Sequence, residues 1–150
     1  MPTHKAEQIL VTVTDLLAGL DTTGDSVRRS RVYDWSDDEL PGISVFMGAD
    51  NPADNEARNI GFYDWVLQVR IEAACKSFNY SGIDTTLNAI RAEVTAALML
   101  DHKMGLDFVI DTIEQGSDEP ELTGEGEKPA ARQVFTFTVK YRRSLGDPRQ

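Results

Sequence analysis

The chain has 150 residues, the length of one ordinary domain, and a domain of this size buries about 70% of the surface that its unfolded chain exposes. It carries 25 Asp and Glu against 15 Lys and Arg, and the net charge of −10 excludes nucleic-acid binding by phosphate neutralisation. A single cysteine, Cys75, excludes an intrachain disulfide, and no stretch approaches the roughly 20 apolar residues of a membrane span. We therefore expect one soluble domain over residues 1–150, made in the cytoplasm and without a membrane segment.

An amphipathic helix is predicted at the N-terminus. Apolar side chains recur at steps of three and four from Ala6 to Leu20, and Thr3 can cap the first turn. Ser26 to Tyr33 then predicts a short strand. This strand holds a cluster of three arginines, Arg28, Arg29 and Arg31. The cluster is interpreted either as a solvated sheet edge without a binding role or as an interface with acidic residues of a partner.

The next two segments differ in apolar content. In Leu40 to Gly48, Ile43, Val45 and Met47 alternate with Ser44 and Phe46 after Pro41. This pattern is expected of a strand that begins at a proline. Ala49 to Asn59 has almost no apolar side chains and many turn formers, so we expect an exposed hairpin arm or loop there.

The longest strand signal runs from Phe62 to Cys75. One row of alternate side chains is apolar and consists of Tyr63, Trp65, Leu67, Val69, Ile71, Ala73 and Cys75. Because successive side chains point to opposite faces, this register places the apolar row on the core. One covered face and one wet face indicate a mainly antiparallel sheet.

The second half of the chain predicts a helix and two strands. Ser81 and Asp84 resemble a capping box before an apolar stripe that continues to about Leu100. Strands are predicted for Leu106 to Glu114 and for Gln133 to Arg143, which is rich in β-branched and aromatic residues. The inward side chains of the last strand are predicted to be Phe135, Phe137, Val139 and Tyr141.

Between these strands, Gln115 to Ala131 offers nothing to bury and predicts a loop. Its acidic residues are Asp118, Glu119, Glu121, Glu125 and Glu127. Together the elements predict an α+β domain with a mainly antiparallel sheet of four to five strands and two helices packed on one face. Flexible loops are expected near residues 49–60 and 115–131.

A search for chemistry finds no motif. His4 and His102 have no partners at metal-ligand spacing, and Cys75 lies on the apolar row. No nucleophile elbow, phosphate-binding loop or dinucleotide fingerprint is present in the sequence. We therefore expect no catalytic residues, no metal and no cofactor.

The order and texture of the elements resemble the tail terminator proteins of long-tailed bacteriophages, the group similar to minor tail protein U. The likeness covers nearly the whole chain. It rests on the N-terminal helix, the strand PGISVF after an acidic turn, the long strand YDWVLQVRIEA, the helix GIDTTLNAIRAEVTAAL and the final strand FTFTVKYR. The resemblance includes no catalytic sequence motif.

This resemblance implies a structural virion protein. Its copies would form a homo-oligomeric ring, usually a hexamer, that caps the tail tube, ends polymerisation and presents a surface to the head–tail connector. The implied partners are the tail tube protein and the connector protein, and DNA would pass through the ring without specific binding. The implied location is the head-proximal end of the virion tail, after assembly in the host cytoplasm.

A ring suggests two roles for charged side chains. The residues expected to line the channel are Asp118, Glu119, Glu121, Glu125 and Glu127, for which a solvated hairpin tip is the alternative interpretation. Head-to-tail contacts join two different patches of each subunit. The residues expected at this subunit interface are Arg28, Arg29, Arg31, Asp50, Asn51, Arg70, Arg142 and Arg143.

Two alternatives follow from the same sequence. A neck adaptor, a stopper or another tail-completion protein would belong to the same virions, and binding on the portal side would identify it. A small enzyme or ligand-binding protein would instead need a deep pocket in which distant residues such as Asp64, Glu72 and His102 converge.

Overall fold

The computed structural model describes residues 3–30, 39–53, 61–76, 80–123 and 130–150. The elements in this part of the chain are α1 (Lys5–Leu17), β1 (Val27–Arg29), β2 (Gly42–Pro52), β3 (Phe62–Lys76), α2 (Tyr80–Met99), β4 (Val109–Ser117), β5 (Glu121–Thr123) and β6 (Ala130–Ser144). The strands form one sheet that is mostly antiparallel, so the predicted α+β class is confirmed.

The sheet has the strand order β1-β2-β3-β6-β4, and β5 pairs with the start of β6. β1 runs parallel to β2, and the other described pairs are antiparallel. The described sheet has six strands where four to five were predicted, and the additional strand, β5, lies inside the segment predicted to be a loop. Glu121 pairs with Arg132 and Thr123 with Ala130, so pairing with the backbone of β6 makes a strand where the sequence has little to bury.

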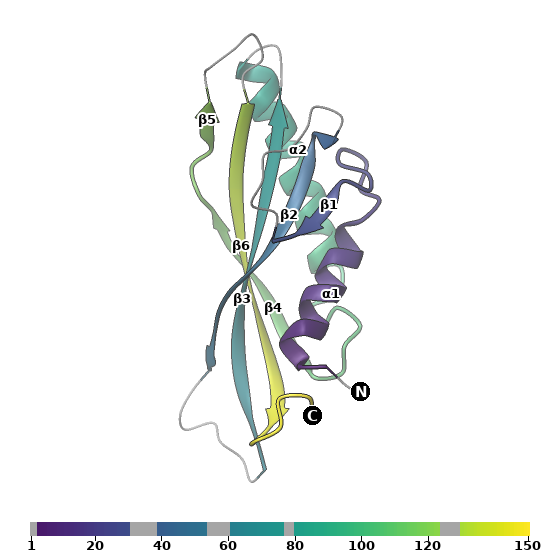
Figure 1. Cartoon of the computed structure of the whole chain (residues 1–150), viewed down its shortest axis with the longest axis vertical. Helices are drawn as coiled ribbons and strands as arrows, with labels where there is room; N and C mark the ends of the chain where they lie inside the picture. The colour runs from purple at the N-terminus through teal and green to yellow at the C-terminus, as the bar shows by residue number, and fades with distance from the viewer. Residues whose placement is uncertain (1–2, 31–38, 54–60, 77–79, 124–129) are drawn as a thin grey trace.

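β3 and β6 form the longest pairing in the sheet. Their register runs without a break from Phe62 opposite Ser144 to Lys76 opposite Ala130. In Figure 1 the two strands extend along the long axis of the molecule. The predicted inward row of β6 is buried, as are the residues from Leu67 to Cys75 on the apolar row of β3, so the predicted register is confirmed.

Both helices pack against the same face of the sheet, as predicted (Figure 1). α1 contributes Ala6, Ile9, Leu10, Val13 and Leu17 to the core, and α2 contributes Ile83, Leu87, Ile90, Val94 and Leu98. These spacings place each apolar stripe along one side of its helix. Neither described helix is long and apolar enough to cross a membrane.

The expected arm after β2 is partly a strand. β2 continues through residues 49–52, with a shift in register between Met47 and Asp50. A Cβ atom at Gly48 would lie 2.9 Å from the backbone oxygen of Gln68, so glycine permits this close approach between the two strands. The rest of the expected arm, residues 54–59, lies outside the described residues.

Both helices begin at positions other than those predicted. His4 rather than Thr3 caps α1, because its Nδ1 accepts a hydrogen bond from the amide of Ala6 at 3.0 Å. α2 begins at Tyr80, so Ser81 lies inside the helix instead of capping it.

A tight turn separates α2 from β4. The carboxylate of Asp101 accepts hydrogen bonds from the amides of Lys103 and Gly105, at 3.0 and 2.9 Å. These backbone bonds lower the pKa of Asp101. β4 follows the turn and covers Val109–Ser117 rather than Leu106 to Glu114.

The two faces of β6 give a direct test of the fold. Phe135→Ala removes a buried aromatic side chain and is expected to lower the free energy of unfolding by about 3–5 kcal/mol. Thr136→Ala, its matched control on the opposite face, should cost less than about 1 kcal/mol. Urea denaturation followed by circular dichroism measures both values, and equal costs would contradict the assignment of the faces.

Candidate functional site

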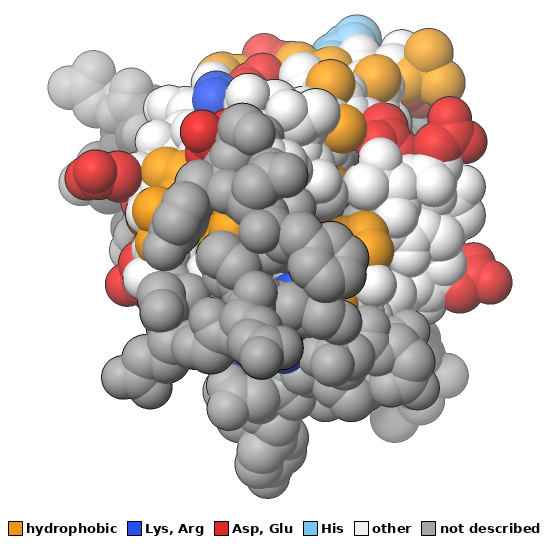
Figure 2. All heavy atoms as spheres, turned by 90° about the horizontal axis from the view of Figure 1, so that it is seen from above, with side chains coloured by type: hydrophobic (Ala, Val, Ile, Leu, Met, Phe, Trp, Pro, Cys, Tyr) orange, Lys and Arg blue, Asp and Glu red, His pale blue; other side chains and the backbone are white. Residues whose placement is uncertain are grey.

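The described acidic residues of the predicted channel lining lie at one end of the sheet. Asp118, Glu119 and Glu121 are exposed, and the neighbouring Leu122 is also 52% exposed. Figure 2 looks onto this end of the molecule and shows acidic side chains at several points around its rim. We call Asp118, Glu119, Glu121 and Leu122 the acidic edge. The other two predicted residues, at positions 125 and 127, lie outside the described residues.

The arginines of β1 are partly engaged within the chain. Arg29 forms an ion pair with Glu7 of α1, and the hydrogen bond from Arg29 lowers the pKa of that carboxyl. Arg28 is exposed and donates to the carbonyl oxygens of Asp25 and Val27. Arg31 lies outside the described residues. Arg29 thus joins β1 to α1, a contact that spacing in the sequence does not reveal.

Arg70 and Arg142 lie on the sheet face opposite the helices. Arg70 is exposed near the middle of β3. Arg142 is engaged: its Nε donates to Oδ1 of Asp64 at 2.8 Å, and Asp64 is only 7% exposed. The guanidinium of Arg142 also lies over the ring of Phe62, 4.7 Å from the centroid.

Asp50 and Asn51 belong to β2. Asn51 is exposed, whereas Oδ2 of Asp50 accepts a hydrogen bond from the buried hydroxyl of Tyr141 at 2.8 Å. Burial raises the pKa of Asp50, and the bond from Tyr141 and the charge of Arg143 oppose this shift. Oδ1 of Asp50 is buried and has no hydrogen-bond partner within the described part of the chain. Asp50 therefore forms its hydrogen bond within the chain, to the core residue Tyr141.

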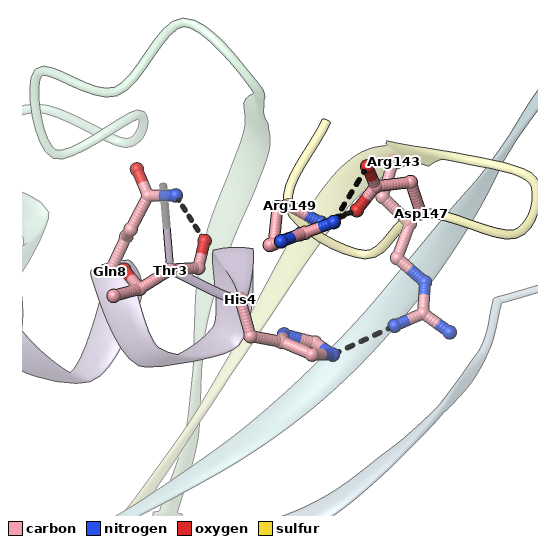
Figure 3. A network of polar contacts seen from close by, with 6 residues as sticks. All are labelled: Thr3, His4, Gln8, Arg143, Asp147 and Arg149. Carbon is pink, nitrogen blue, oxygen red and sulfur yellow. Dashed lines mark hydrogen bonds and ion pairs between the residues drawn. The ribbon is translucent and has the colours of Figure 1, made fainter. Parts of the chain in front are cut away.

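Arg143 points toward the start of α1. Its Nη1 lies 2.9 Å from Nε2 of His4 (Figure 3), and its guanidinium lies 3.6 Å from the ring centroid of Trp65. Arginine can only donate, and a neutral imidazole has one accepting nitrogen, so Arg143 competes with the amide of Ala6 for His4. Sequence spacing did not reveal this contact of His4, because only the fold brings β6 to the helix cap.

The chain termini meet beside this contact. The amide of Lys5 donates to the carbonyl oxygen of Pro148 at 2.9 Å. Arg149 and Asp147 form an ion pair at 3.0 Å within the C-terminal turn (Figure 3). The same region of the fold thus contains both the start of α1 and the end of β6.

An open groove of about 830 Å³ lies next to this region, and Lys5 belongs to its lining. Its charged lining consists of Lys5, Lys103, Lys140, Arg142, Asp64 and Asp107, and residues 108–110 supply its apolar wall. We call this the cationic groove. Sequence reasoning did not find it, because its cations come from α1, the turn after α2 and β6.

The three residues proposed for an enzyme or ligand site do not converge. Asp64 lines the cationic groove, but Glu72 pairs with Arg132 at 4.0 Å and His102 is exposed on the turn after α2. Among the described residues there is no group of three or more His, Cys, Asp or Glu that could hold a metal. Burial raises the pKa of Cys75 to about 11, which disfavours the reactive thiolate.

Comparisons with known proteins give a fold-level likeness. No protein-family model matches the sequence, and no curated protein matches it. A chain in a solved structure entitled "Virion of native gene transfer agent (GTA) particle" is similar, with 16% sequence identity and a TM-score of 0.48. The match covers 85% of this chain and 84% of that chain. A likeness at these levels carries no argument about function.

The contact between Asp50 and Tyr141 can be tested by substitution. Asp50→Ala leaves the buried hydroxyl without its acceptor and is expected to lower the free energy of unfolding by about 1–3 kcal/mol. Asp50→Asn keeps an acceptor oxygen and should cost less than Asp50→Ala. Urea denaturation at neutral pH measures the order, and equal losses would contradict the role of the hydrogen bond.

The raised pKa of Asp50 also predicts that the stability of the original protein depends on pH more than that of Asp50→Asn. Because the pKa of Asp50 is raised in the folded state, the native protein holds this proton more tightly than the unfolded chain does. The stability contributed by the protonated carboxyl is present at acid pH and is lost as the pH rises through the folded-state pKa. Asp50→Asn should therefore gain stability relative to the original protein between acid and neutral pH. A difference independent of pH would contradict the burial of this carboxyl.

Proposed function

We propose that this chain is a structural virion protein that forms a ring at the head-proximal end of a long phage tail. The ring, of six copies, caps the tail tube, ends its polymerisation and offers a surface to the head–tail connector. The proposal rests on the resemblance of the element order and texture to tail terminator proteins. It involves no catalysis.

One observation carries the proposal from fold to assembly: the described surface has a cationic groove near the end of β6 and an acidic edge near its start. A ring is built from heterologous contacts, in which one patch of a subunit meets a different patch of the next. Two distant surfaces of opposite charge on one chain suit such a contact.

The acidic composition suits a channel for DNA. Six copies with a net charge of −10 each would carry a total of −60, and like charge repels phosphate within the screening distance of about 10 Å. Two positions in a ring suit the carboxylates of the acidic edge. On the channel wall they would repel DNA, and at the subunit joint they would face cations of a neighbour.

The proposal is tested with the tail tube protein of the same virus. Purified chain added to polymerising tube protein is expected to stop growth, giving shorter tubes with a ring at one end. Electron microscopy with a gold label on this chain measures both tube length and end occupancy. An unrelated acidic protein of similar mass serves as the control.

Two results would contradict the proposal. Tubes that reach the same length with and without the chain, and that carry no label, would exclude a terminator. Label on isolated connector or portal rings but not on tube ends would favour the neck adaptor or stopper.

A further inference from the structure

We propose that the cationic groove of one copy binds the acidic edge of the next copy, so that the chain assembles head to tail. This inference rests on the proposed ring and deepens it by naming the two surfaces that meet. The occupant of the groove is therefore the segment around β5 of a second copy.

The groove is lined by more cationic side chains than carboxylates. Four cations and two carboxylates line it, which leaves a net charge of +2 in a chain whose total is −10. Arg142 is paired with Asp64, and Nζ of Lys5 donates to the carbonyl oxygen of Arg142 at 2.9 Å. The side chains of Lys103 and Lys140 form no ion pair with any described residue. Asp111 lies opposite Lys140 in the pairing of β4 with β6 but forms no ion pair with it, so both lysines can bind a carboxylate from outside the chain.

The wall of the groove also offers apolar contact. Phe108 and Ile110 are half-buried there, and Nζ of Lys5 lies 4.9 Å from the ring centroid of Phe108. A ligand with an apolar side chain next to carboxylates would match this combination of an apolar wall and free ammonium groups.

The acidic edge carries an apolar side chain and carboxylates on one short strand. Leu122 is 52% exposed and follows Glu121 along β5, so the two side chains lie on opposite sides of the strand, and Glu119 lies two residues before Glu121. β5 pairs with β6 and with no other described strand. It therefore presents one strand edge, an apolar side chain and exposed carboxylates together.

The two surfaces are too far apart to meet within one chain. The acidic edge pairs with β6 at Arg132, whereas Lys140 of the groove lies eight residues further along the same strand. At the usual rise of a strand this is about 26 Å, and β6 pairs with β3 without a break over this length. The contact must therefore join two copies, and a repeated heterologous contact produces a ring when its rotation closes.

Charge reversal tests the contact by loss and by rescue. Lys103→Glu/Lys140→Glu reverses the groove, and Glu119→Lys/Glu121→Lys reverses the edge. Each variant alone is expected to raise the dissociation constant of self-association at least tenfold, as measured by analytical ultracentrifugation at low salt. A 1:1 mixture should assemble again, because each reversed surface then meets a complementary surface on the other variant.

A matched control changes charge elsewhere. Asp21 and Asp25 are exposed in the turn after α1, and Asp21→Lys/Asp25→Lys alters the net charge by the same amount as the edge reversal. This variant should associate as the original protein does. Circular dichroism and thermal melting establish that every variant is folded before association is measured.

The outcomes separate this inference from the proposed function. If the two reversed variants associate as well as the original protein, or if the mixture shows no rescue, the proposal is overturned. An original chain that stays monomeric up to about 1 mM also overturns it. Capping of tubes by a chain that fails these tests would leave the terminator function intact and exclude only the named contact.

Discussion

The backbone pairing of β3 with β6 is the constraint on which the rest of the structure depends. It runs unbroken from Phe62 opposite Ser144 to Lys76 opposite Ala130, and β2, β4 and β5 all pair with one of these two strands. Because side chains alternate along both strands, this one register decides which residues both helices cover and which stay on the open face. A slip of one residue would expose the whole inward row of β6.

The same pairing separates the two surfaces that we propose to meet in the assembly. The start of β6 holds β5 and the acidic edge, and its other end contributes Lys140 and Arg142 to the cationic groove. Two adjacent arginines at that end have different tasks, because Arg142 faces the open side with Asp64 while Arg143 faces His4 and Trp65. The strand thus connects the core, the helix cap and the groove.

The sequence was sufficient for the elements whose patterns repeat. Alternation in β3 and β6 and three- and four-residue steps in the helices left few arrangements that bury the apolar residues, and these predictions were confirmed. Contacts between distant polar residues had no such pattern. The ion pair of Arg29 with Glu7, the bond of Tyr141 to Asp50 and the groove arise only when the fold brings separate segments together. β5 was missed because its pairing partner, not its own composition, makes it a strand.

Electron cryo-microscopy of the particles formed by the purified chain would test the assembly account most directly. We predict closed rings with an open centre, in which the β5 end of each copy contacts the groove formed by α1, β4 and β6 of the next. Particles with two-fold symmetry, in which the same surface of both copies meets, would contradict head-to-tail assembly. Open filaments would contradict the ring.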